Sequence, residues 1–166
     1  MGLFGKKKAR LAAEREAREK QELANRIRAQ AKEQADQWLK IVKDCAEIVN
    51  TTKNPEVFFN RYRLMLDYLE KLAGLECTGI FSNSPELPSE AFLRTESIFP
   101  GETNCFINRS FEAVKAKADT LKTQKGKLNA IGRYFEDMEK HIISMEPESV
   151  DYLEDLKNRI MGEYQQ

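Results

Sequence analysis

The apolar residues of this chain recur at the spacing of α-helices. In residues 23–50 they fall mostly three or four positions apart and place Trp38 within one continuous stripe, which predicts a helix with a core-facing side. Residues 6–22 share the helix-forming composition but have almost no large apolar side chain except Leu11, so we expect a helix without a core face there. The pattern divides the chain into a charged N-terminal helical arm, residues 1–22, and a helical bundle domain, residues 23–166.

A second helix is predicted after a break at residues 51–54. Asn54 is a good N-cap, and Pro55 stands where proline is best tolerated, at the first helical position. Gly74 is the expected end of this helix. Because the connection is short, the two helices should form an antiparallel hairpin. The aromatic residues expected to anchor it in the core are Phe58, Phe59 and Tyr62.

The clearest periodicity lies in residues 103–145, where six apolar residues stand at unbroken seven-residue spacing. They are Ile107, Val114, Leu121, Leu128, Phe135 and Ile142. This spacing predicts one long helix with a coiled-coil-like seam, and we expect Leu121, Leu128 and Phe135, like Trp38, to be core anchors. Gly126 and Gly132 fall where the seam changes phase, so a bend or break is expected there. A last helix should begin at Pro147.

Residues 75–102 are the least regular part of the chain, since prolines and glycines interrupt them repeatedly. We expect an irregular loop with a brief helix over residues 89–97, and a pairing of two short strands is left open. Loops of this kind often carry function. Residues that could contact a partner are Arg61 in the preceding helix and, in the loop, Ile80, Phe81, Ile98 and Phe99. The fold class predicted is all-α, an elongated antiparallel helical bundle with a long N-terminal helix and a long 103–145 helix.

Charge is distributed unevenly along the chain, although 27 basic residues balance 27 acidic ones. Residues 1–35 contain ten Lys and Arg against five Glu, whereas residues 136–166 are the acidic extreme. The basic arm could meet an anionic surface, fold back onto the acidic end, or serve as a solubilising helix. The residues expected to contact a membrane or another anion are Leu3, Phe4, Lys6, Lys7, Lys8 and Arg10. Nucleic acid is less favoured, because residues 6–35 offer no aromatic side chain for base stacking.

Little in the sequence indicates catalysis. His141 is the single histidine, and Cys45, Cys77 and Cys105 lack the close pairing of structural zinc ligands. No phosphate-binding glycine loop and no nucleophile motif is present. We therefore expect no catalytic residue, no metal site, no cofactor and no enzyme activity. No apolar run approaches the length of a membrane-spanning helix and no signal peptide is recognisable, so a cytoplasmic location is predicted, either free or peripheral at the inner face of the membrane.

One segment resembles known sequences. Residues 54–62, Asn-Pro-Glu-Val-Phe-Phe-Asn-Arg-Tyr, and the Gly-Leu-Phe-Gly-Lys start are similar to segments of small uncharacterised helical proteins of Gram-positive bacteria and their mobile elements. The resemblance covers a small part of the chain. It implies a bacterial, cytoplasmic, helical protein and no particular activity.

These observations predict a non-catalytic helical scaffold that acts through protein–protein contacts. The partner is a protein of unknown identity, and homodimerisation through unfilled seam surface is an open alternative. A peripheral membrane adaptor that uses the basic N-terminus is the second hypothesis. A nucleic-acid-associated accessory protein is the third.

Overall fold

The computed structural model describes residues 2–95 and 102–166, and within these ranges the fold is all-α, as predicted. The first three helices are α1 (Leu3–Thr51), α2 (Pro55–Glu76) and α3 (Pro88–Thr95). The others are α4 (Glu102–Asp119), α5 (Gln124–Glu139), the short 3₁₀ helix η1 (Ile142–Ser144) and α6 (Pro147–Gln165). No strand occurs in the described ranges, so the strand pairing left open for the loop is not found in its described part.

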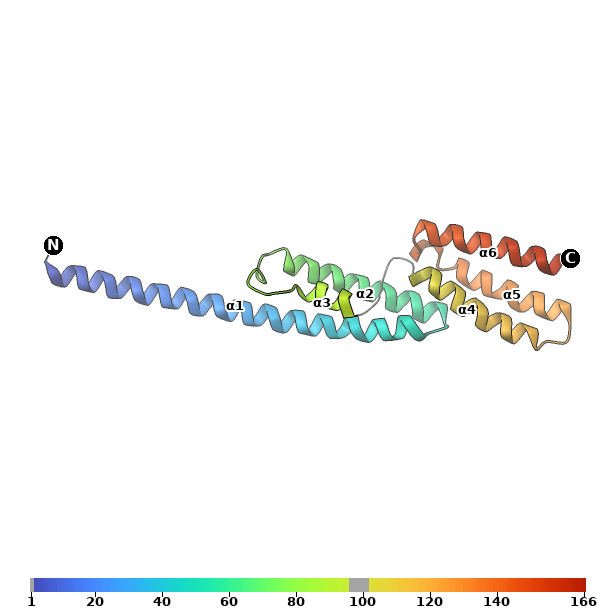
Figure 1. The fold of residues 1–166 in the computed structure, drawn as a ribbon, viewed down its shortest axis with the longest axis horizontal. Coiled ribbons are helices and arrows are strands. Elements are labelled where there is room, and N and C mark those ends of the chain that lie inside the picture. The colour runs from blue at the N-terminus through green and yellow to red at the C-terminus, as the bar shows by residue number, and fades with distance from the viewer. Residues whose placement is uncertain (1, 96–101) are drawn as a thin grey trace.

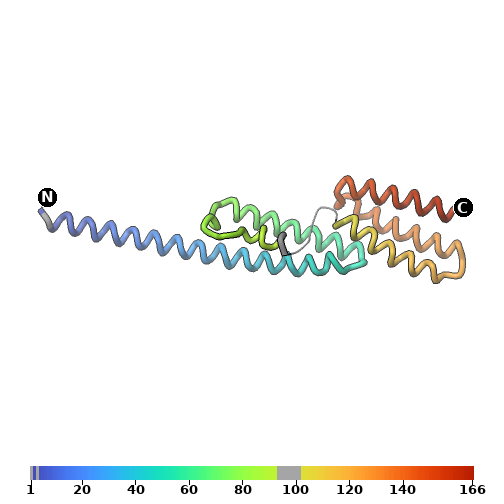
Figure 2. Tube along the Cα trace, in the orientation of Figure 1, coloured from blue at the N-terminus to red at the C-terminus, as the bar shows by residue number. Residues whose placement is uncertain are grey.

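The molecule is elongated, with its two termini at opposite ends (Figure 1). Helices α1 and α2 form the predicted antiparallel hairpin, and α3 packs against both of them. Helices α4, α5 and α6 form a second bundle beyond the closed end of this hairpin (Figures 1 and 2). Because the arm points away from α6, the basic N-terminus does not fold back onto the acidic C-terminal end.

Helix α1 continues far beyond the end of α2 as an unaccompanied arm (Figure 2). Among the side chains described in residues 2–30, all are exposed except Ala24, which is half-buried. Burial begins only at Ala31, so the expected start of the core face at residue 23 was wrong. The apolar side chains of Leu23 and Ile27 remain exposed because α2 does not reach them.

The start of α2 follows the prediction closely. The side chain of Asn54 accepts a hydrogen bond of 3.2 Å from the backbone N–H of Val57, and Pro55 opens the helix. The expected end at Gly74 was wrong, because α2 continues to Glu76. The left-handed residue that follows is Gly79, with φ of 75°, a conformation that glycine adopts without steric cost.

The predicted 103–145 helix is two helices. Helix α4 ends at Asp119 and α5 begins at Gln124, so the chain reverses ahead of Gly126 and Gly132. The break is fixed by a cap, since the Thr123 hydroxyl accepts a hydrogen bond of 3.1 Å from the Gly126 N–H. A Cβ at position 126 would lie 2.9 Å from this hydroxyl, so the glycine leaves room for the cap.

The expected core anchors differ in burial. Phe58, Phe59, Tyr62 and Phe135 are buried. Trp38 and Leu128 are only half-buried, and Leu121 is 41% exposed because it lies in the break between α4 and α5. The centre of the core is aromatic: the rings of Phe58 in α2 and Phe106 in α4 stack at 4.1 Å between centroids, which joins the hairpin to the second bundle.

The broken helix makes a prediction about stability. We expect Leu121→Ala to lower the free energy of unfolding by less than about 1 kcal/mol, since exposed positions contribute little. Phe135→Ala should cost about 3–5 kcal/mol, because the Phe135 side chain is buried. Urea unfolding of the two variants measures the difference. Equal losses in the free energy of unfolding would contradict the break, because they would mean that Leu121 is packed in the core as it would be in one continuous helix.

None of the helices in the described ranges is long and apolar enough to cross a membrane.

Candidate functional site

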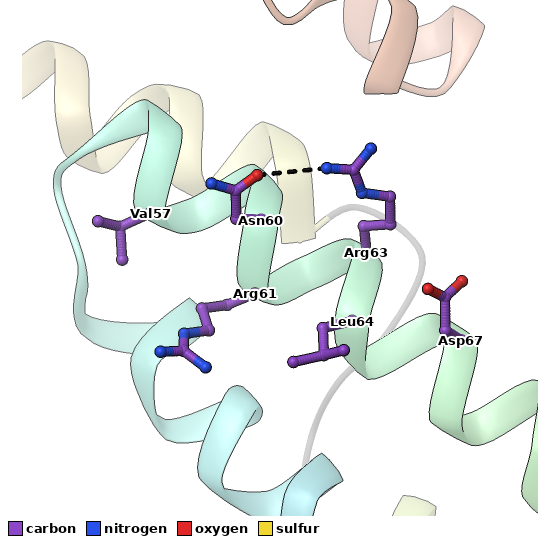
Figure 3. A pocket seen from close by; sticks show the side chains of 6 residues that line it. All are labelled: Val57, Asn60, Arg61, Arg63, Leu64 and Asp67. Carbon is purple, nitrogen blue, oxygen red and sulfur yellow. Dashed lines mark hydrogen bonds between the residues drawn. The ribbon is translucent and has the colours of Figure 1, made fainter.

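An open groove of about 440 Å³ lies along one face of α2 (Figure 3). Its six lining residues all belong to this helix: Val57, Asn60, Arg61, Arg63, Leu64 and Asp67. Positions 57, 61 and 64 share one side of a helix because they are four and three residues apart. The groove therefore includes Arg61, which the sequence had marked as a contact for a partner.

Arg61 is an exposed cation at the edge between α2 and α1. Its side chain leans toward α1, whereas Arg63 extends to the other side of α2 and donates a 3.3 Å hydrogen bond to Oδ1 of Asn60 (Figure 3). Within the described residues, Arg61 is in no ion pair. Burial raises the pKa of the neighbouring Cys45 thiol, and the guanidinium of Arg61 acts in the opposite direction. The guanidinium of Arg61 is thus held beside Cys45 of α1, and no carboxylate pairs with it among the described residues.

The groove also offers apolar surface. Val57 is 39% exposed although it is a large aliphatic residue, and Leu64 is half-buried one helical turn beyond Arg61. A cation between two aliphatic side chains suits a carboxylate that is itself flanked by apolar groups, because arginine binds carboxylates in a planar, two-bonded geometry.

A buried polar cluster behind α2 fixes the helix in place. The Tyr62 hydroxyl donates to Oε1 of Glu146, and the Thr103 hydroxyl donates to Oε2, each at 2.9 Å. Glu146 precedes α6 and Thr103 lies in α4, so one carboxylate ties α2 to both helices. The carboxylate thereby sets the position of α2 against the second bundle.

In this cluster the pKa of Tyr62 is raised and the pKa of Glu146 is lowered. Burial raises the pKa of Tyr62, and the hydrogen bond to Glu146 raises it further. Burial alone would raise the pKa of Glu146. Hydrogen bonds from its own backbone, Thr103 and Tyr62 outweigh that effect and leave the pKa of Glu146 below its ordinary value. The cluster therefore favours an ionised glutamate that accepts from a neutral tyrosine.

A second link joins the hairpin to α4. The guanidinium of Arg109 donates to the backbone oxygens of Val49 at 2.7 Å and Thr52 at 3.1 Å. These carbonyls lie at the C-terminus of α1, where a cation is favoured by the helix dipole and satisfies otherwise unpaired acceptors. Sequence reasoning missed both Arg109 and Glu146, because their partners are distant in the chain. The only local signal was the position of Glu146 just before the helix-opening Pro147.

The other predicted contact residues do not gather at the groove. Ile80 and Phe81 are half-buried in the turns after α2, whereas the groove is lined by residues 57–67 of that helix. Ile98 and Phe99 lie outside the described residues. The structure thus brings only Arg61 of this set into the groove.

The residues predicted to contact anions occupy the tip of the arm. Phe4, Lys6, Lys7, Lys8 and Arg10 are exposed there. Leu3 begins α1, but its side chain is not among those described. The tip of the arm is thus separate from the groove of α2 (Figure 1).

The residues capable of acid–base or metal chemistry are dispersed. His141 stacks on the ring of Phe59 at 4.8 Å between centroids, while Cys45 is buried and Cys77 and Cys105 are exposed. In the part of the chain that the structure describes, no group of three or more His, Cys, Asp or Glu side chains is placed to hold a metal ion.

No protein-family model, curated protein or solved structure matches this chain. The resemblance of residues 54–62 to small proteins of Gram-positive bacteria therefore stays a prediction.

Proposed function

We propose that this protein is a non-catalytic helical scaffold that binds a partner protein through the Arg61 groove, the face of α2 lined by Val57, Asn60, Arg61, Arg63, Leu64 and Asp67. The observation that carries the proposal is the exposed Arg61, which has no ion pair within the described residues and lies between the exposed Val57 and the half-buried Leu64. Such arginines are enriched among the residues that dominate the energy of protein interfaces.

The partner that fits this groove is a helix with a carboxylate between apolar residues. Helices recognise one another through side chains spaced three and four positions apart, which is the spacing of Val57, Arg61 and Leu64. The rigidity of α2 helps, because a preorganised surface loses little entropy on binding. The Glu146 cluster and the core ring of Phe58 supply that rigidity from behind the groove.

Charge reversal at Arg61 tests the proposal. We expect Arg61→Glu to reduce recovery of the partner by about ten-fold or more, since charge-assisted hydrogen bonds contribute roughly 1.5–3 kcal/mol. The measurement is quantitative mass spectrometry of proteins that co-purify with the tagged full-length chain from cells that produce it. Circular dichroism verifies that the variant is folded.

The matched control is Arg133→Glu, which makes the same charge change at an exposed position of α5. It should recover the partner as well as the wild-type chain does. A partner that binds both variants equally would contradict the proposal. The proposal would also be contradicted if no co-purifying protein were lost when Arg61 is replaced by glutamate.

A further inference from the structure

The arm of α1 has two distinguishable sides, although it is exposed all round. Phe4 is 90% exposed and Leu11 is 57% exposed. They stand seven positions apart, so they lie on the same side of the helix, and Lys7 and Lys8 lie between them on that side. Arg18 continues the row another seven positions along. We call Phe4, Lys7, Lys8, Leu11 and Arg18 the basic–apolar face.

The cations of this face have no anionic partners in the described part of the chain. Three other cations of the arm are paired: Arg10 with Glu14 at 2.9 Å, Arg15 with Glu19 at 3.1 Å and Lys20 with Glu16 at 2.6 Å. Lys7, Lys8 and Arg18 are in no ion pair within the described residues. Lys6, Arg26 and Arg28 are likewise in no ion pair within the described residues, so unpaired positive charge extends along the arm, and Lys7 and Lys8 place part of it beside Phe4 and Leu11.

The helix itself adds to this positive charge. The first turn of α1 contains no acidic residue, and the N-terminus of a helix carries the positive end of the helix dipole. Lysines there repel the dipole, so the isolated arm keeps an electrostatic cost that an anionic surface would remove.

We propose that the basic–apolar face lies on an anionic lipid bilayer, with Phe4 and Leu11 at the boundary of the acyl chains and the three cations among the headgroups. Interfacial helices combine these two kinds of side chain on one side. Nucleic acid fits less well, because Leu11 offers no ring for a base and Phe4 is the one aromatic residue of the first 35. This inference does not depend on the Arg61 groove.

The length of the arm determines where the hairpin would lie relative to the membrane. The unaccompanied part of α1, residues 3–30, is about 40 Å long at a rise of about 1.5 Å per residue. The hairpin and the Arg61 groove begin beyond it (Figure 1). An arm lying on the bilayer would hold the hairpin, and with it the groove, close to the membrane.

Flotation of the full chain with vesicles tests the proposal. The wild-type protein should float with vesicles of phosphatidylserine and phosphatidylcholine and stay behind with vesicles of phosphatidylcholine alone. Lys7→Glu with Lys8→Glu should weaken the binding by about ten-fold or more, since each basic residue near the surface contributes on the order of a few-fold. Phe4→Ser with Leu11→Ser should weaken it comparably.

Two matched controls distinguish binding through the basic–apolar face from binding through the overall charge of the arm. Lys6→Glu with Lys20→Glu makes the same charge change on the far side of the same helix. Because a helix is about 10 Å wide and the Debye length at physiological salt is about 8 Å, most of the binding should remain. Ala9→Ser with Ala13→Ser is the corresponding control for the apolar pair.

Three results would overturn the inference. The first is that the wild-type protein does not float with the anionic vesicles. The second is an equal loss of binding in both lysine pairs, which would mean that charge alone acts and no face exists. The third is retention on duplex DNA or RNA without any flotation, which would assign the arm to nucleic acid.

Discussion

Replacing Phe58 by alanine is expected to lower the free energy of unfolding by about 3–5 kcal/mol. The Phe58 ring is fully buried. It stacks on Phe106 at 4.1 Å and contacts Phe59 and Tyr62 at centroid distances of 5.0 and 5.4 Å. Removing the ring leaves a cavity between α2 and α4, where the hairpin and the second bundle meet. Urea unfolding followed by circular dichroism measures the loss.

The matched control lies on the same helix. Leu66 is exposed, so Leu66→Ala should cost less than about 1 kcal/mol. In the wild-type chain, fluorescence of Trp38, the single tryptophan, should report the same transition as circular dichroism, since the core joins both halves. A Phe58→Ala loss below about 1 kcal/mol, or two separate transitions, would show that the halves are independent.

The second large effect is expected at Glu146. Changing this residue to glutamine removes the charge and turns one acceptor into a donor that faces the Tyr62 or the Thr103 hydroxyl. Leaving a buried hydroxyl badly paired costs roughly 1–3 kcal/mol. We therefore expect Glu146→Gln to destabilise the chain by about this amount at neutral pH, as measured by urea unfolding.

The pH dependence of stability gives the same residue a sharper test. Because the pKa of Glu146 is lowered from 4.5 in the folded chain, its contribution is present above pH 4.5 and is lost as the pH falls through the folded pKa. The pKa of Tyr62 is raised from 10, so the contribution of Tyr62 is present below pH 10 and is lost as the pH rises further. Stability of the wild-type chain should decline at both limits.

In Glu146→Gln the acid-dependent decline should be smaller than in the wild-type chain. Glu148→Gln is the control, because Glu148 is exposed in the first turn of α6 and accepts no hydrogen bond from Tyr62 or Thr103, so its acid-dependent decline should stay close to that of the wild-type chain. Identical acid limbs for the wild-type chain and Glu146→Gln would contradict the arrangement of the cluster.

The sequence predicts the hairpin well, because its signals are local. Asn54 and Pro55 fix where α2 begins, and the aromatic residues that follow leave no alternative core face. The prediction that Leu121 is a core anchor of one long helix was wrong. Seven-residue spacing continues across residues 120–123, yet the Thr123 cap starts a new helix there. Periodicity reports which side of a helix is apolar, whereas a short cap decides whether the helix continues.

The candidate site was predictable only in part. The sequence indicated Arg61 as a partner contact, because it is a charged residue within the apolar pattern of the helix that begins at Pro55. The extent of the unaccompanied arm depends on where α2 ends, and the roles of Arg109 and Glu146 depend on partners far along the chain. Such long-range pairings leave no periodic trace in a sequence. The folded chain shows which residues anchor α2 behind the groove and where α1 becomes unaccompanied.

Photo-crosslinking from the groove tests the central proposal most directly. A photoreactive amino acid placed at Leu64 should form a covalent adduct with one partner protein in the producing cells. The same probe at Glu70, an exposed position of α2 outside the groove, should form none. The adduct should disappear when Arg61→Glu is added. Equal adducts from both positions, or an adduct that persists in the Arg61→Glu background, would contradict a scaffold that binds its partner through this groove.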